Sequence, residues 1–141
     1  MISTSTSTSA SAYTSRALSL LRIVSAFLFI QHGTAKFFGV PHVGMFDGFQ
    51  VASLMGVAGA LELVGGALLL IGLFSRPVAF VLAGFMAAAY FMGHASKGHV
   101  LTPILNQGEL AIMFCFAFLF IGAAGGGAWS VDSLRGKATA A

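Results

Sequence analysis

The residue with the clearest chemical potential is Glu62, which lies near the midpoint of a long apolar run. Residues 51–74 are apolar or small almost throughout, and Glu62 is their one carboxylate. An ionised carboxylate at the centre of a bilayer is costly unless it faces protein, water or a cation. We therefore expect a basic partner from a neighbouring segment, and we name Glu62 as a candidate proton relay.

Other polar side chains in the apolar segments could serve a quinone. A quinone ring needs an apolar slot, hydrogen-bond partners at its carbonyls and a route for protons. The phenylalanines that could line such a slot are Phe27, Phe29, Phe37, Phe38, Phe85 and Phe91. No side chain in the sequence carries electrons, so a partner protein would have to, and we expect no covalently bound cofactor. The candidate quinone or ligand pocket consists of His32, Lys36, Glu62, His94, Asn106 and Glu109.

A structural interpretation competes with the quinone pocket. At 100° per residue, Lys36 falls about 40° and His32 about 80° from Arg22, so all three share one arc of a helix. Glu62 could then pair with Arg22 or His32 and fix the bundle, with the phenylalanines facing lipid. Lys36 could instead extend to the membrane surface. We assign Arg22 and Arg76 to structural ion pairing.

The elements that must position these residues are apolar helices. The chain has 141 residues, of which 57% are hydrophobic and 8% charged, a balance far from that of an average soluble domain. Apolar segments at about residues 17–38, 51–74, 77–94 and 108–124 predict an all-α polytopic membrane protein with a bundle of four transmembrane helices. Glycines around Glu62 predict a tight helix crossing.

The flanking segments predict the boundaries and the orientation. Residues 1–15 are rich in Ser and Thr and predict a disordered, uncleaved tail. Residues 16–129 form the membrane domain, and residues 130–141 form a cytoplasmic tail. The positive-inside rule predicts both termini inside, in the bacterial plasma (inner) membrane. Basic residues on the terminal side are Arg16, Arg76, Arg135 and Lys137, against Lys36 and Lys97 on the other.

Several functional classes have little support in the sequence. The net charge of +3 comes from scattered Lys and Arg, so we expect no nucleic-acid partner. The single cysteine, Cys115, allows neither an internal disulfide nor a CxxC redox pair. No HxxxH or HxxE spacing occurs within one helix, and we therefore expect no metal site.

The same residues resemble a known family. The motifs are L-R and H-G-x-x-K-F within residues 21–37, G-x-L-E-L-x-G-G-x-L-L-L-x-G-L-F-x-R in residues 59–76, N-x-G-E in residues 106–109 and W-S-V-D-S in residues 129–133. Their order and spacing resemble the DoxX family of small bacterial membrane proteins. The resemblance covers nearly the whole chain after residue 15.

The resemblance implies a membrane protein with four helices, associated in some members with redox partners. These members include a subunit of a thiosulfate:quinone oxidoreductase and a membrane partner of sulfurtransferase and superoxide dismutase. Residues 106–109 read Asn-Gln-Gly-Glu where the family has Asn-Gly-Gly-Glu. The polar positions that the family implies are Arg22, His32, Lys36, Glu62, Arg76, His94, Asn106 and Glu109.

Three functions follow as expectations. The first is an accessory or quinone-contacting subunit of a membrane redox system, an oxidoreductase component without its own electron carrier. The alternative is a non-catalytic scaffold that holds peripheral redox or stress-response enzymes at the bilayer. A small transporter or channel has less support, since four helices would need homo-oligomerisation to enclose a pathway.

Overall fold

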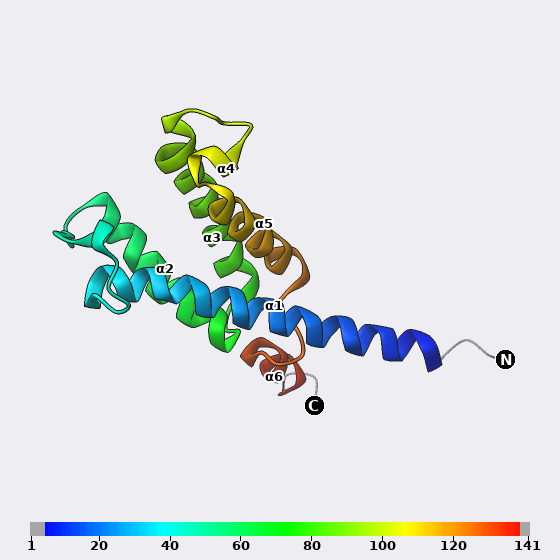
Figure 1. Cartoon of the computed structure of the whole chain (residues 1–141). Coiled ribbons are helices and arrows are strands. Elements are labelled where there is room, and N and C mark those ends of the chain that lie inside the picture. The colour runs from blue at the N-terminus through cyan, green and yellow to red at the C-terminus, as the bar shows by residue number, and fades with distance from the viewer. Residues whose placement is uncertain (1–4, 139–141) are drawn as a thin grey trace.

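The computed structural model describes residues 5–138, in which every regular element is helical (Figure 1). The predicted all-α class is therefore confirmed. The α-helices are α1 (Ser5–Phe38), α2 (Leu54–Ile71), α3 (Ser75–Ala89), α4 (Pro103–Asn106), α5 (Glu109–Ala124) and α6 (Val131–Ala138). Short 3-10 turns are η1 (Gly44–Phe46) and η3 (Ala95–Lys97), and a π-helical turn, η2 (Tyr90–His94), ends the third long helix.

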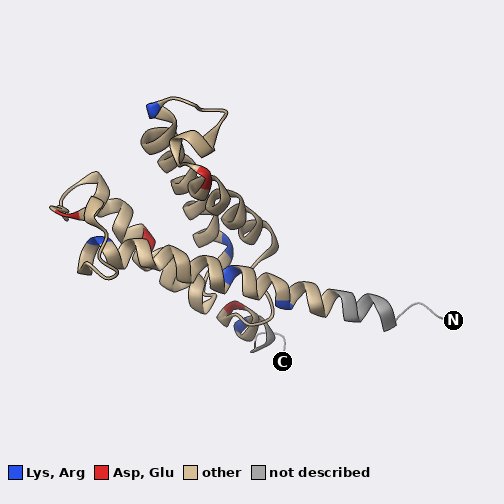
Figure 2. Ribbon diagram, viewed as in Figure 1, with Lys and Arg blue, Asp and Glu red and all other residues tan. Residues whose placement is uncertain are grey.

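The long helices form two hairpins that diverge from a shared base. α1 packs along α2, and α3 packs along α5 (Figure 1). The loop after α1 and the loop after η3 lie at the tips of separate arms, whereas α6 lies near the base. Most of the ribbon carries no charged residue (Figure 2). Because the two arms diverge, charged residues near the tip of one arm lie apart from those near the tip of the other.

The apolar core lies where the two hairpins meet. Phe29 of α1 contacts three rings edge-on, with centroid distances of 4.9 Å to Phe118, 5.4 Å to Phe114 and 6.3 Å to Phe85. Such edge-to-face pairs stabilise a core beyond their buried area alone. The remaining buried core residues are Ala26, Leu69, Ala79, Leu82, Ala83, Met86 and Ile121.

Small residues bring α1 and α2 into close contact. A Cβ added to Gly33 would lie 3.0 Å from the Gly59 carbonyl oxygen and 2.7 Å from Leu63 Cγ. A Cβ at Gly66 would lie 2.5 Å from Ile30 Cγ1. Because only glycine leaves room for this approach, the predicted tight crossing at the Glu62 helix is confirmed.

Three of the described helical segments are long and apolar enough to cross a membrane: 28 residues at Ser11–Phe38, 18 at Leu54–Ile71 and 23 at Ser75–Lys97. α5 is equally apolar but has 16 residues, or about 24 Å at the rise of an α-helix. The prediction of a membrane-spanning helical protein is confirmed, and the fourth span remains a prediction.

The prediction of disorder over residues 1–15 differs from the structure, because α1 already begins at Ser5. Residues 1–4 lie outside the described residues. Extending an existing helix avoids the unfavourable nucleation step, so even Ser and Thr can continue it. The Ser15 carbonyl also accepts hydrogen bonds from Ser19 Oγ at 3.0 Å and from the Ala128 amide at 3.3 Å.

The segment expected to form a tail after residue 129 is helical at α6 and packs against the start of α3. The Asp132 carboxylate accepts hydrogen bonds from the Phe74 amide at 2.8 Å and the Ser75 amide at 2.7 Å. The Asp132 amide donates to the Gly72 carbonyl at 3.0 Å. A carboxylate at a helix N-terminus satisfies free amides and complements the helix dipole, so α6 is anchored to the start of α3.

Candidate functional site

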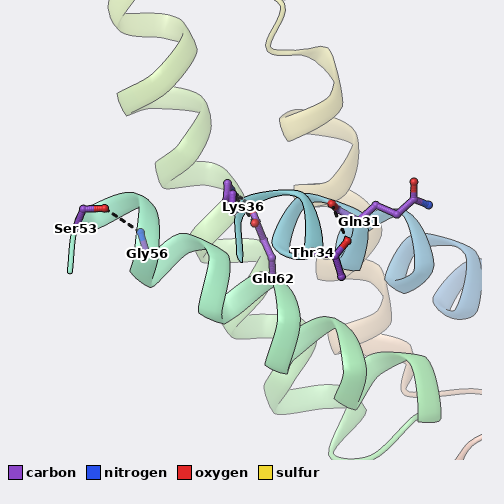
Figure 3. A network of polar contacts seen from close by, with 6 residues as sticks. All are labelled: Gln31, Thr34, Lys36, Ser53, Gly56 and Glu62. Atoms are coloured by element: carbon purple, nitrogen blue, oxygen red, sulfur yellow. Dashed lines mark hydrogen bonds and ion pairs between the residues drawn. The ribbon is translucent and has the colours of Figure 1, made fainter. Parts of the chain in front are cut away.

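Glu62 is paired with Lys36. Lys36 in the last turn of α1 and Glu62 in the middle of α2 point toward each other (Figure 3). Lys36 Nζ lies 2.5 Å from Glu62 Oε1 and 2.7 Å from Oε2. Both residues are buried, with relative exposures of 8% and 4%. The expected basic partner is therefore present.

The identity of this partner corrects two expectations. Glu62 pairs with Lys36, not with Arg22 or His32, and the Lys36 side chain is buried within the protein instead of extending outward. The geometric reason is that α1 and α2 approach closely beside the pair. A Cβ at Gly59 would lie 3.4 Å from Lys36 Cδ, so the lysine stem runs along α2 and its ammonium meets Glu62 one turn further on.

Arg22 is fully buried, at 0% exposure, and binds backbone carbonyls. Its Nε donates to the Gly126 carbonyl at 2.8 Å, and its Nη1 donates to the Leu70 carbonyl at 2.7 Å. The Leu69 and Trp129 carbonyls accept further hydrogen bonds from the same guanidinium. Since the last carbonyls of a helix lack intrahelical donors, Arg22 joins α1 to the end of α2 and to the segment before α6.

The predicted ion pairing of Arg22 and Arg76 is not found within residues 5–138. Arg76 is exposed, and its Nη2 donates to the Ala124 carbonyl at 3.5 Å. A cation at the C-terminus of α5 complements the helix dipole. Both arginines thus act on helix ends and not on carboxylates.

His32 lies at the junction of the two arms, one turn before Lys36. It is half-buried, and its ring meets that of Phe114 of α5 edge-on, with centroids 6.3 Å apart. Within the described part of the chain the His32 side chain makes no hydrogen bond or ion pair. An imidazole can donate from one nitrogen and accept at the other, so this residue keeps capacity for a ligand.

His94 and Asn106 meet at the tip of the other arm. His94 Nδ1 lies 3.0 Å from the Asn106 carbonyl oxygen, which can only accept, so Nδ1 carries the proton. Asn106 Nδ2 donates to the Gly98 and His99 carbonyls, each at 3.2 Å. Tyr90 Oη donates to the Val100 carbonyl at 2.6 Å. These side chains hold the loop before α5 in place.

The six candidate pocket residues therefore fall into separate groups. Lys36 and Glu62 lie between α1 and α2, and His32 lies at the junction. His94 and Asn106 lie on the other arm, beside an exposed Glu109 in the first turn of α5. Because the arms diverge, the structure does not bring these side chains into one pocket.

The hollow nearest the core offers no polar partner. It lies between α2 and α3 with a volume of about 280 Å³. Its lining is apolar, so it could hold a hydrocarbon chain but could not bind a quinone carbonyl. The residues that line this hollow are Leu61, Val64, Gly65, Leu68, Pro77, Val78, Val81 and Leu82.

Within residues 5–138, no three His, Cys, Asp or Glu side chains lie together as a metal site requires.

Two polar residues outside the predicted set organise the base. Ser19 is buried and accepts a hydrogen bond from the Trp129 amide at 3.0 Å. Burial acts to raise the pKa of Asp132, but the Ser75 and Phe74 hydrogen bonds and the Arg135 charge hold that pKa below its usual value. Asp132 belongs to the W-S-V-D-S motif, which was the signal in the sequence for this role.

Comparisons with known proteins point to a single family. The DoxX family model matches residues 17–95. An uncharacterized protein of Haemophilus influenzae is 45% identical over 119 residues, covering 82% of this chain and 88% of the relative. The inner membrane protein YqjF of Escherichia coli is 30% identical over 123 residues, covering 82% of this chain and 89% of YqjF. No solved structure matches.

These relatives also bear on location. A relative named as an inner membrane protein, together with three helices of membrane-spanning length, confirms the predicted multi-pass location in the inner membrane. Four of the buried or interhelical charged residues lie within the matched residues 17–95, namely Arg22, Lys36, Glu62 and Arg76. The Lys36–Glu62 pair therefore belongs to the part of the chain that the family model matches.

Proposed function

The chain belongs to the DoxX family, and we propose that it is an accessory subunit of a membrane redox system with four spans and both termini in the cytoplasm. Redox association is the role that the family resemblance implies. The distribution of Lys and Arg supports the orientation. α5 would complete the fourth span with the turn that precedes it, since a short apolar helix can cross where the bilayer thins.

The observation that carries the accessory role is the internal use of the charged groups. Lys36 occupies both oxygens of Glu62, and the Arg22 guanidinium is taken up by backbone carbonyls. Charges arranged in this way hold helices together and leave little capacity for chemistry. Electron transfer would then belong to a partner protein, and this subunit would position that partner at the bilayer.

Quinone contact is the second candidate, and the observation that favours it is His32. Its half-buried imidazole makes no hydrogen bond in the described part of the chain and lies beside the Phe114 ring, which itself packs against Phe29. An imidazole at an aromatic wall suits a quinone carbonyl or a quinol hydroxyl. In this proposal Glu62 would relay protons through Lys36, since Lys36 Nζ contacts both of its oxygens.

The scaffold alternative has support in the ordered loop at the tip of the second arm. Asn106 and Tyr90 fix that loop from inside, and Leu101 extends outward with 94% exposure. A fixed loop presents the same surface to each partner and so lowers the entropic cost of binding. A transporter or channel has less support, because the polar groups form separate, internally bonded clusters.

The test combines affinity purification with photoreactive quinone labelling. The protein is purified in mild detergent, and mass spectrometry identifies co-purifying quinones and proteins. Quinone contact predicts labelling near α1 that His32→Phe removes and that His42→Phe, an exposed loop control, retains. The scaffold predicts that Leu101→Asp loses protein partners while His32→Phe keeps them. Purification without any quinone or redox protein would refute the redox role.

A further inference from the structure

We propose that the loop of residues 39–53 is a lid, with Phe46 as its closing residue, that controls access of water to the Lys36–Glu62 pair. This inference goes beyond the accessory role, because it concerns when the buried pair can exchange with the solvent. It rests on the contacts of the loop and not on any redox partner.

The first support is the position of Phe46 over the ammonium group. Lys36 Nζ lies 5.2 Å from the centroid of the Phe46 ring, within the range of a cation–π contact. Lys36 is in the last turn of α1, so the loop that connects α1 to α2 begins just after it and places Phe46 next to its ammonium group. In this proposal the Phe46 ring lies between the Lys36 ammonium and the solvent, and water reaches the pair only when the ring moves.

The second support is the local character of the loop's hydrogen bonds. The Phe46 amide donates to Val43, the Asp47 amide to Gly44 and the Phe49 amide to Phe46, at 2.9, 3.1 and 3.0 Å. Ser53 Oγ donates to the Gln50 carbonyl at 2.6 Å. The two ends of the loop stay attached, at Gly39 and Val40 to α1 and at Ser53, the N-cap of α2. The bonds of residues 43–50 lie within the loop, so lifting this middle part would leave the hydrogen bonds of α1 and α2 intact.

The third support is the packing around the loop. Phe49 anchors it to α1 through an edge contact with Phe37, with centroids 5.1 Å apart. A hollow of about 280 Å³ lies within the loop and against the start of α2, and Phe46 forms part of its wall. An aromatic ring beside empty space can change position without displacing packed neighbours. The loop is thus held by few contacts and has room to open.

Amine labelling of the purified full-length protein in nanodiscs tests the lid. A water-soluble acylating reagent reports on Lys36, and Lys97 in an exposed turn is the internal standard. A lid predicts slow Lys36 labelling at a rate that stops rising at high reagent concentration, because opening limits it. Phe46→Ala should raise that rate roughly tenfold, and Phe46→Trp should lower it, following the strength of the cation–π contact.

Met45→Ala is the matched control, since Met45 is the exposed neighbour of Phe46 in the same turn. It should leave Lys36 labelling unchanged, and thermal unfolding should show the Phe46 variants to be folded. The proposal is overturned if Lys36 reacts only under conditions that unfold the bundle, or as fast as Lys97. It is also overturned if Met45→Ala and Phe46→Ala have equal effects.

Discussion

At the scale of residues, the buried charges are stabilised in two different ways. Lys36 and Glu62 neutralise each other across α1 and α2, whereas Arg22 is bound by carbonyls at the end of α2 and before α6. A buried charge that loses its partner is strongly destabilising, because neither lipid nor the protein core replaces the lost interaction. Each pattern therefore makes its own prediction.

Replacing Arg22 should destabilise the base of the protein. Arg22→Met would remove a donor from four buried or partly buried carbonyl oxygens, of which, within the described residues, only that of Leu69 keeps another donor, the Gly72 amide. Each buried oxygen left without a donor costs about 1–3 kcal/mol. Arg22→Lys should recover part of the loss, because an ammonium keeps the charge but lacks the planar set of donors. Unfolding in mixed micelles measures both variants. Arg16→Met, at an exposed position of α1, is the control, and a loss equal to that of Arg22→Met would contradict the assignment.

Glu62 shows which part of the buried pair could be predicted from the sequence and which part could not. The isolation of one carboxylate in an apolar run predicted a basic partner, and the structure confirms one. The partner itself could not be predicted, because angles around α1 place Arg22, His32 and Lys36 on one arc without saying how closely α2 approaches. The glycines at the crossing set that distance, and a lysine stem then reaches Glu62.

At the scale of elements, the approach of α1 to α2 depends on glycine. Gly33→Ala should destabilise the hairpin by about 1–3 kcal/mol, because the new methyl group meets the Gly59 carbonyl and Leu63. Gly84→Ala is the matched control, since a Cβ there meets no atom within 4 Å. Unfolding measurements compare the two variants. Equal effects would mean that helix propensity and not the crossing decides the result.

The contact between α6 and α3 should depend on pH. The pKa of Asp132 is lowered in the folded protein, so its contribution is complete above the ordinary value of 3.8 and is lost as the pH falls through the folded value. Asp132→Ala should lower stability at neutral pH by about 0.5–2 kcal/mol, as for a lost helix cap. Unfolding curves of wild type and variant should converge in acid. A constant difference at all pH values would contradict this role.

The ends of the elements were harder to predict than their centres. Periodicity does not show that Asp132 caps α3, because the two are 57 residues apart and meet only in the folded chain. The Ser- and Thr-rich start of α1 has low apolar content. It can still be helical, because adding residues to an existing helix avoids the unfavourable nucleation step. Composition therefore predicted the apolar spans and underestimated order at both flanks.

At the scale of the whole molecule, two hairpins joined at one base explain why the candidate residues separate. Helix order and apolar length were predictable from the sequence, since each follows from local composition. The divergence of the arms was not, because it is a matter of tertiary packing between helices, of which the contacts among Phe29, Phe114 and Phe118 at the junction are one part. The six residues that the sequence suggested for one pocket are therefore divided between the two arms.

Cysteine labelling in a Cys115→Ser background tests the proposed topology. In intact cells, His42→Cys and Leu101→Cys should react with an impermeant maleimide, because both loops would face outward. Leu134→Cys on α6 should react only after the membrane is opened. Labelling of Leu134→Cys in intact cells would show that α5 does not cross the membrane, leaving three spans.

The central claim is that Lys36 and Glu62 stabilise the protein as a pair, and a double-mutant cycle tests it most directly. The free energy of unfolding is measured for wild type, Lys36→Met, Glu62→Gln and the double variant in mixed micelles. We expect each single change to cost about 3–5 kcal/mol. The double variant should cost less than their sum, with a coupling energy on the order of 1–3 kcal/mol. Losses that simply add would contradict the claim.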